Sequence, residues 1–133
     1  MTSRPTLTVT TVNIGAPDAH ELAEFYLRLL GWEVMVAEPD WIMLRGTGAG
    51  VRLSFQTEPD YVRPVWPSRP DAQQMMLHLE IRVDDLAEGV EHAIACGATL
   101  ADYQPQEDVR VCLDPAGHPF CLWIPRLAPM STT

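Results

Sequence analysis

TTVNIGAPD at residues 10–18 and LHLEIRVDD at residues 77–85 are two versions of one pattern, 67 residues apart. In both stretches apolar and polar side chains alternate with a period of two, which is typical of a strand with one buried face. The apolar positions coincide under this offset, and Asp18 falls on Asp85. Internal repetition of this kind indicates two copies of one structural unit.

The residues around the first stretch predict a strand over 6–16 followed by a helix. Asp18 is the expected N-cap, with Glu21 three residues later as in a capping box, and Gly31 is the expected C-terminal glycine. Between them the apolar side chains recur at helical spacing and form one stripe: Leu22, Phe25, Tyr26, Leu29 and Leu30.

The second stretch predicts the same succession. A strand over 76–84 leads to a helix that begins at Asp84 or Asp85 and ends at Gly97. Its apolar stripe consists of Leu86, Val90, Ala93 and Ile94. Turn residues separate three short strands after each helix, expected over 32–37, 41–45 and 51–56 in the first half and over 98–103, 108–113 and 119–124 in the second.

We therefore expect an α+β fold of two repeated βαβββ modules. They would form a cupped, mainly antiparallel sheet around a cleft, with the helices outside. One domain would occupy residues 1–133, divided into module one, a Pro-rich connection, module two and a tail (6–56, 57–74, 75–125 and 126–133).

The composition of the chain indicates which kinds of binding partner and which compartment are disfavoured. The 133 residues carry 18 acidic and 9 basic side chains, a formal net charge of −9, which disfavours nucleic acid and anionic membrane surfaces. No apolar run approaches the roughly 18 residues that span a bilayer, and the N-terminus has no apolar core of a secretion signal. Three cysteines without paired spacing fit a reduced, cytoplasmic protein rather than a disulfide framework.

Strand alternation assigns a polar set of side chains to the face opposite the helices. A few placed polar groups beside aromatic walls are typical of a ligand pocket. Trp66, in the Pro-rich connection, is a candidate wall, as are Trp41 and Trp123. The expected cleft-facing set is Thr11, Asn13, Arg52, Ser54, Gln56, His78, Glu80, Arg82, Cys121 and Trp123.

The order and spacing of several motifs resemble the vicinal oxygen chelate superfamily, which includes glyoxalase I, bleomycin-resistance proteins and extradiol dioxygenases. The sequence is most similar to glyoxalase-like proteins common in actinobacteria. The resemblance implies a homodimer and, in catalytic members, one divalent metal in the cleft. It rests on Asp18, Phe25-Tyr26, Leu29 to Trp32, His78 to Asp85, Gly97-Ala98 and Asp114 to Phe120.

Carried onto this chain, the four metal-ligand positions of the superfamily fall on Thr11, Ser54, His78 and Cys121. Only His78 is a standard ligand there, and no carboxylate is among the four, whereas open catalytic sites need about three good ligands. We therefore expect no metal cofactor, although a divalent metal held by His78, with Glu80 or Gln56 nearby, stays open.

His78 and Glu80 are also candidate catalytic residues. His78 could act as a general base, and Cys121 could be a nucleophile that His78 activates. The alternative is that His78 only hydrogen-bonds a neighbour and Cys121 only packs. The expected function is binding of a small organic molecule without the superfamily's metal, as in bleomycin-resistance-type sequestering proteins. The alternatives are a metal-dependent lyase, isomerase or dioxygenase, and an enzyme without metal.

Overall fold

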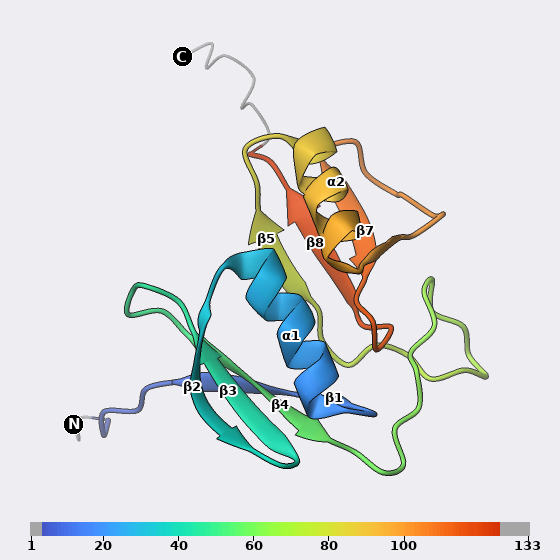
Figure 1. The fold of residues 1–133 in the computed structure, drawn as a ribbon. Coiled ribbons are helices and arrows are strands. Elements are labelled where there is room, and N and C mark those ends of the chain that lie inside the picture. The colour runs from blue at the N-terminus through green and yellow to red at the C-terminus, as the bar shows by residue number, and fades with distance from the viewer. Residues whose placement is uncertain (1–3, 126–133) are drawn as a thin grey trace. The chain divides into compact units, whose positions relative to one another are not determined.

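The computed structural model of the chain describes residues 4–125, so the expected tail at 126–133 lies outside the described residues. The chain divides into two compact units, Met1–Tyr61 and Val62–Thr133. Each unit contains one helix and one four-stranded sheet (Figure 1). The first unit is made of β1 (Thr11–Ala16), α1 (Ala19–Leu30), β2 (Glu33–Glu38), β3 (Trp41–Arg45) and β4 (Arg52–Thr57). The second is made of β5 (Leu79–Arg82), α2 (Leu86–Cys96), β6 (Thr99–Leu100), β7 (Val109–Leu113) and β8 (Pro119–Trp123).

The two sheets have the same topology. Their strand orders are β1-β4-β3-β2 and β5-β8-β7-β6, with one parallel pair and two antiparallel pairs in each. The register repeats as well. Asn13 lies opposite Ser54 in the first sheet and Glu80 opposite Cys121 in the second, which are the same positions shifted by 67 residues. The predicted α+β fold of two βαβββ modules is confirmed, and each module forms its own mainly antiparallel sheet.

The predicted helix boundaries are correct. Asp18 caps α1 by accepting hydrogen bonds from the backbone N–H groups of His20 and Glu21, and Gly31 ends the helix with a φ of 68°. For α2 the structure selects Asp85 rather than Asp84, because the Asp85 side chain accepts the backbone N–H of Glu88.

Each helix packs on one face of its own sheet. In the first module, the Tyr26 ring of α1 stacks on the Phe55 ring of β4, with ring centroids 5.4 Å apart. The same Tyr26 ring meets the Phe25 ring edge-on at a centroid distance of 4.8 Å. Under α2 the contacts are made by smaller side chains, Ala93 and Cys96. The prediction that Ile94 belongs to the buried stripe is wrong, since its side chain is 48% exposed. The helix turns Ala93 and Cys96, three residues apart, toward the sheet instead.

Several predicted strands are longer than the observed ones. The first begins at Thr11 rather than residue 6, and Leu7 and Val9 are exposed. The strand expected over 98–103 is only the two residues of β6. Gln104 explains this early end, because its side-chain amide donates to the carbonyls of Ala101 and Val111 and accepts the N–H of Val111. The Ala101 N–H still donates to the Val111 carbonyl at 3.0 Å. The Gln104 side chain takes the place of the second bond of that pair, from the Val111 N–H to the Ala101 carbonyl.

Candidate functional site

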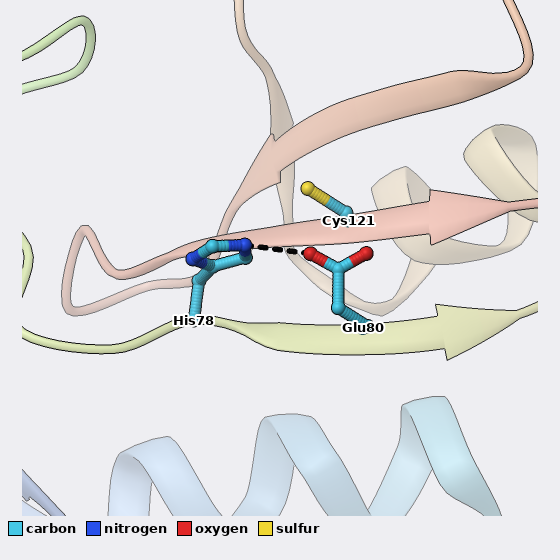
Figure 2. Close-up of side chains that lie close together, drawn as sticks. All are labelled: His78, Glu80 and Cys121. Carbon is cyan, nitrogen blue, oxygen red and sulfur yellow. Dashed lines mark ion pairs between the residues drawn. The ribbon is translucent and has the colours of Figure 1, made fainter.

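The strand alternation predicted from the sequence brings a polar cluster together in the second module. His78 directly precedes β5, Glu80 lies within it, and Cys121 lies opposite Glu80 on β8. Figure 2 shows the three side chains converging from these two neighbouring strands. One nitrogen, one oxygen and one sulfur ligand atom from them lie within 4.8 Å of one another.

Glu80 is the shared acceptor of this cluster. Its Oε2 lies 2.6 Å from Nε2 of His78, which donates to the carboxylate. The thiol of Cys121 donates to the same carboxylate. The Arg82 guanidinium does not pair with Glu80 and lies over the Trp123 ring at 5.9 Å.

The environment of Cys121 does not favour a nucleophile. Burial, together with the negative charge and hydrogen bond of Glu80, raises the pKa of the Cys121 thiol to about 12. The thiolate is the reactive form, so at neutral pH this side chain is a protonated hydrogen-bond donor. On the neighbouring strand β7, the residue opposite Cys121 is Val111. Cys112 is the next residue along β7, so its side chain points to the other face of the sheet. A bridge between these two cysteines does not fit this register.

A pocket of about 140 Å³ opens over the cluster. Trp66 lines it from the connection between the modules, and its indole N–H donates to the carbonyl of Tyr103 at 3.4 Å. Trp66 thus lies in the Pro-rich segment and forms one side of this pocket. The remaining lining was not predicted, because it comes from loops, from β7 and from the start of β8: Met75, Pro105, Gln106, Val109, Val111 and Pro119. The alternation of β7 is the one signal that could have found Val109 and Val111.

The equivalent face of the first module is a closed hydrogen-bond network. Asn13 Oδ1 accepts from Ser54 Oγ at 2.7 Å and from Trp41 Nε1 at 3.2 Å. Its amide donates to Gln56, and the Gln56 amide donates to Glu58. Ser54 is only 1% exposed. These groups satisfy one another, so Ser54 and Trp41 are tied into the module itself.

Thr11 and Arg52 are the remaining predicted site residues of the first module, and they make different contacts. Thr11 Oγ donates to the hydroxyl of Thr10 at 3.4 Å. Arg52 lines a separate hollow of about 680 Å³ in the first module, around the loop 46–50. In that hollow Arg45 is already paired with Glu33 at 2.8 Å. His20, on α1, contacts the carbonyl of Glu38 at 2.6 Å.

The family model for the glyoxalase-like domain matches residues 10–123. This chain belongs to the glyoxalase-like domain family. The match spans every described strand and helix of both modules, from β1 to β8, and it agrees with the repeated topology. Within residues 4–125 neither helix has the length and apolar character needed to cross a membrane.

Several solved structures share the fold of this chain. A glyoxalase/bleomycin resistance protein/dioxygenase family enzyme from Burkholderia phytofirmans PsJN is 19% identical, with a TM-score of 0.67 over 89% of this chain and 98% of that one. TnmS3, an antibiotic binding protein from Streptomyces sp. CB03234, is 18% identical, with a TM-score of 0.63 over 93% and 100%. Lactoylglutathione lyase from Agrobacterium tumefaciens is 15% identical, with a TM-score of 0.58 over 91% and 96%. No curated protein sequence matches the chain. At these identities the likeness shows the fold alone.

Proposed function

We propose that this glyoxalase-like protein binds a small organic molecule in the pocket of its second module, without the superfamily's four-position metal site. The observation that carries the proposal is the convergence of Trp66 with His78, Glu80 and Cys121 around one pocket. These residues come from three separate segments of the chain. An apolar wall beside a few oriented polar groups is the usual composition of a small-molecule site.

The chemistry of the four superfamily positions argues against a metal held by all of them. Neutral hydroxyls are weak ligands for Zn²⁺ or Fe²⁺. The hydroxyl of Ser54 is buried and donates to Asn13, and Thr11 donates to Thr10. Half of the set is therefore unsuited to hold a divalent cation.

The charge of the pocket indicates which ligands it would favour. Glu80 supplies a carboxylate that is half exposed, and the chain as a whole carries a net charge of −9. A ligand with a cationic group and an aromatic surface would match Glu80 and Trp66. One protein of this fold is an antibiotic binding protein, and sequestration of such a compound requires only a shaped pocket.

Thermal unfolding tests the proposal directly. Reduced protein freed of metal with a chelator is screened against cationic and aromatic natural products. A ligand at 100 times its dissociation constant should add about 2.7 kcal/mol to the free energy of unfolding. We expect Trp66→Ala to remove most of this stabilisation and Trp66→Phe to retain it. Glu80→Gln should weaken the binding of cationic ligands. Glu91→Gln, at an exposed position on α2, should not weaken it. Stabilisation that is equal in all four variants would overturn the proposal.

A second candidate function is a metal-dependent lyase, isomerase or dioxygenase. It is favoured by one observation, the His78, Glu80 and Cys121 cluster, which offers three ligand atoms in one module. In that case His78 and Glu80 would touch the reacting groups. A reaction that needs added metal and is lost in His78→Ala would favour this candidate over simple binding.

The remaining expectations about partners are part of the same proposal. We propose a homodimer that binds neither nucleic acid nor membrane and acts in the cytoplasm. The net charge of −9 supports the expectation that the protein binds neither nucleic acid nor membrane. The three free thiols, Cys96, Cys112 and Cys121, support a reducing compartment such as the cytoplasm.

A further inference from the structure

We propose that the hollow around residues 46–50 in the first module binds a small anionic ligand through a phosphate or carboxylate group. The hollow measures about 680 Å³, and every residue that lines it belongs to the first unit, Met1–Tyr61. It shares no lining residue with the pocket of the second module, and its ligand has the opposite charge. Such a site goes beyond the proposed binding function and does not rest on it.

Arg52 supplies the positive charge of this hollow. It begins β4, where its backbone N–H donates to the Thr10 carbonyl at 2.9 Å. The other two charged residues in the lining, Arg45 and Glu33, pair with each other at 2.8 Å. Within residues 4–125 no carboxylate forms an ion pair with Arg52. Its guanidinium donors are therefore available to a phosphate or a carboxylate, whose planar or forked geometry they match.

The backbone of the loop supplies further donors. Residues 46–50, with the sequence GTGAG, connect β3 to β4 and line the hollow. In the described part of the chain, none of their N–H groups donates to a protein acceptor. Backbone N–H groups that a loop leaves unpaired are a common component of anion-binding sites. Thr8 adds a hydroxyl to the same lining, so hydrogen-bond donors surround Arg52.

The glycines of the loop indicate that a ligand comes close to its backbone. Neither Gly48 nor Gly50 has a positive φ, and a Cβ added at either would meet no atom within 4 Å. Backbone conformation and packing within the chain therefore do not require glycine at these positions. Gly46 is different, because its added Cβ would lie 2.9 Å from Nε1 of Trp32. Glycine at 48 and 50 instead keeps the loop open to close approach by a ligand.

The charge and size of the hollow define the class of ligand. Because Arg45 and Glu33 neutralise each other, the lining has one net positive charge on a chain of net charge −9. A cationic ligand would be repelled by Arg52, and a long polyanion would be repelled by the rest of the chain. A volume of about 680 Å³ is within the usual range for a small-molecule site. The ligand is therefore a small molecule with an anionic group.

Calorimetric titration of the full chain with inorganic phosphate, pyrophosphate and citrate tests the proposal. We expect one saturable site per chain for at least one of these anions, and the preferred anion distinguishes a phosphate group from a carboxylate group. Arg52→Gln should weaken this binding at least about tenfold, because it removes a charge-assisted hydrogen bond. Arg69→Gln is the matched control, because it removes the same charge at an exposed position of the second module. Its affinity should equal that of the wild-type chain.

A loop variant tests the role of the glycines independently of charge. The double variant Gly48→Leu/Gly50→Leu adds side chains where the chain has open space, so thermal unfolding should stay unchanged while anion binding is lost. No saturable binding of any of the three anions to the folded wild-type chain would overturn the proposal. Equal losses in Arg52→Gln and Arg69→Gln, or full binding by the loop variant, would also overturn it. Trp66→Ala should leave anion binding unchanged, so either proposal can fail while the other holds.

Discussion

Ser54 and Cys121 occupy equivalent positions in the two modules, yet their side chains have different roles. Ser54 is buried and donates to Asn13, which also holds Trp41. Cys121 is partly exposed, contacts Glu80 and lines a pocket. One repeated backbone thus carries a structural network in the first module and a candidate site in the second.

The Asn13 network gives a prediction about stability. Asn13→Ala leaves the buried Ser54 hydroxyl without its acceptor and should lower the free energy of unfolding by about 1–3 kcal/mol. Ser54→Ala removes the buried group itself and should cost less. The double variant should lose less than the sum of the two, with a coupling of at least about 0.5 kcal/mol. Urea unfolding of the four proteins measures this coupling, and strictly additive losses would contradict the prediction.

Cys112 gives a prediction about pH. Its side chain is fully buried, and burial raises the pKa of its thiol from 9.0 to about 11. The folded state therefore holds this proton more tightly than the unfolded chain, so the contribution is complete below pH 9 and is lost as the pH rises to about 11. We expect a loss on the order of 1–3 kcal/mol over this interval.

Urea midpoints at pH 8 to 11 test the Cys112 prediction against Cys112→Ala. The variant keeps the other titrating groups, so its stability should fall less steeply than that of the wild-type chain. Parallel curves would show that Cys112 contributes nothing to the alkaline loss.

At the scale of the element, local chemistry decides where helices begin and end. Asp18 and Asp85 each place a carboxylate on the first free N–H groups of a helix. Spacing alone identified Asp18, whereas it left Asp84 and Asp85 as alternatives for the second helix. Strand ends are different, because they depend on partners distant in the sequence. The end of β6 is set by Gln104, whose amide occupies the pairing site of Val111 on β7.

The second helix offers a matched pair of variants. Asp85→Ala removes the acceptor of the Glu88 N–H and should cost about 0.5–2 kcal/mol. Asp84→Ala changes an exposed neighbour that does not cap the helix and should cost less than about 0.5 kcal/mol. Thermal unfolding of both variants distinguishes them. Equal losses would mean that charge near the helix start, rather than the cap hydrogen bond, is responsible.

At the scale of the whole molecule, the exposed strand β2 is the surface most suited to a second copy of the chain. It is the last strand in its sheet order, and every residue of it is exposed. Val34, Met35 and Val36 are 46%, 39% and 37% accessible. An apolar edge strand left uncovered invites pairing with another chain.

We therefore expect sedimentation equilibrium to give about twice the chain mass of 14.8 kDa. Val36→Lys introduces the charge that edge strands commonly use against pairing, and it should shift the protein toward monomer. Ala87→Lys, at an exposed position on α2, is the control and should leave the mass unchanged. A dimer that persists in Val36→Lys would place the interface elsewhere, and a monomeric wild-type chain would contradict the dimer.

The sequence by itself determined the features that depend on local patterns: the repeat at 67 residues, the N-cap of the first helix, the glycines that end both helices, the buried and polar faces of the strands, and the family. Period two was sufficient to place His78, Glu80 and Cys121 on one face, because alternation in a strand needs no partner. Only the tertiary structure decided which of these groups meet. Strand pairing set Glu80 opposite Cys121. The chain segment before β5 placed Trp66 and Met75 in the lining of the same pocket. The physical reason is that such contacts join residues tens of positions apart, and their register arises from packing of the whole module rather than from any short stretch of the chain.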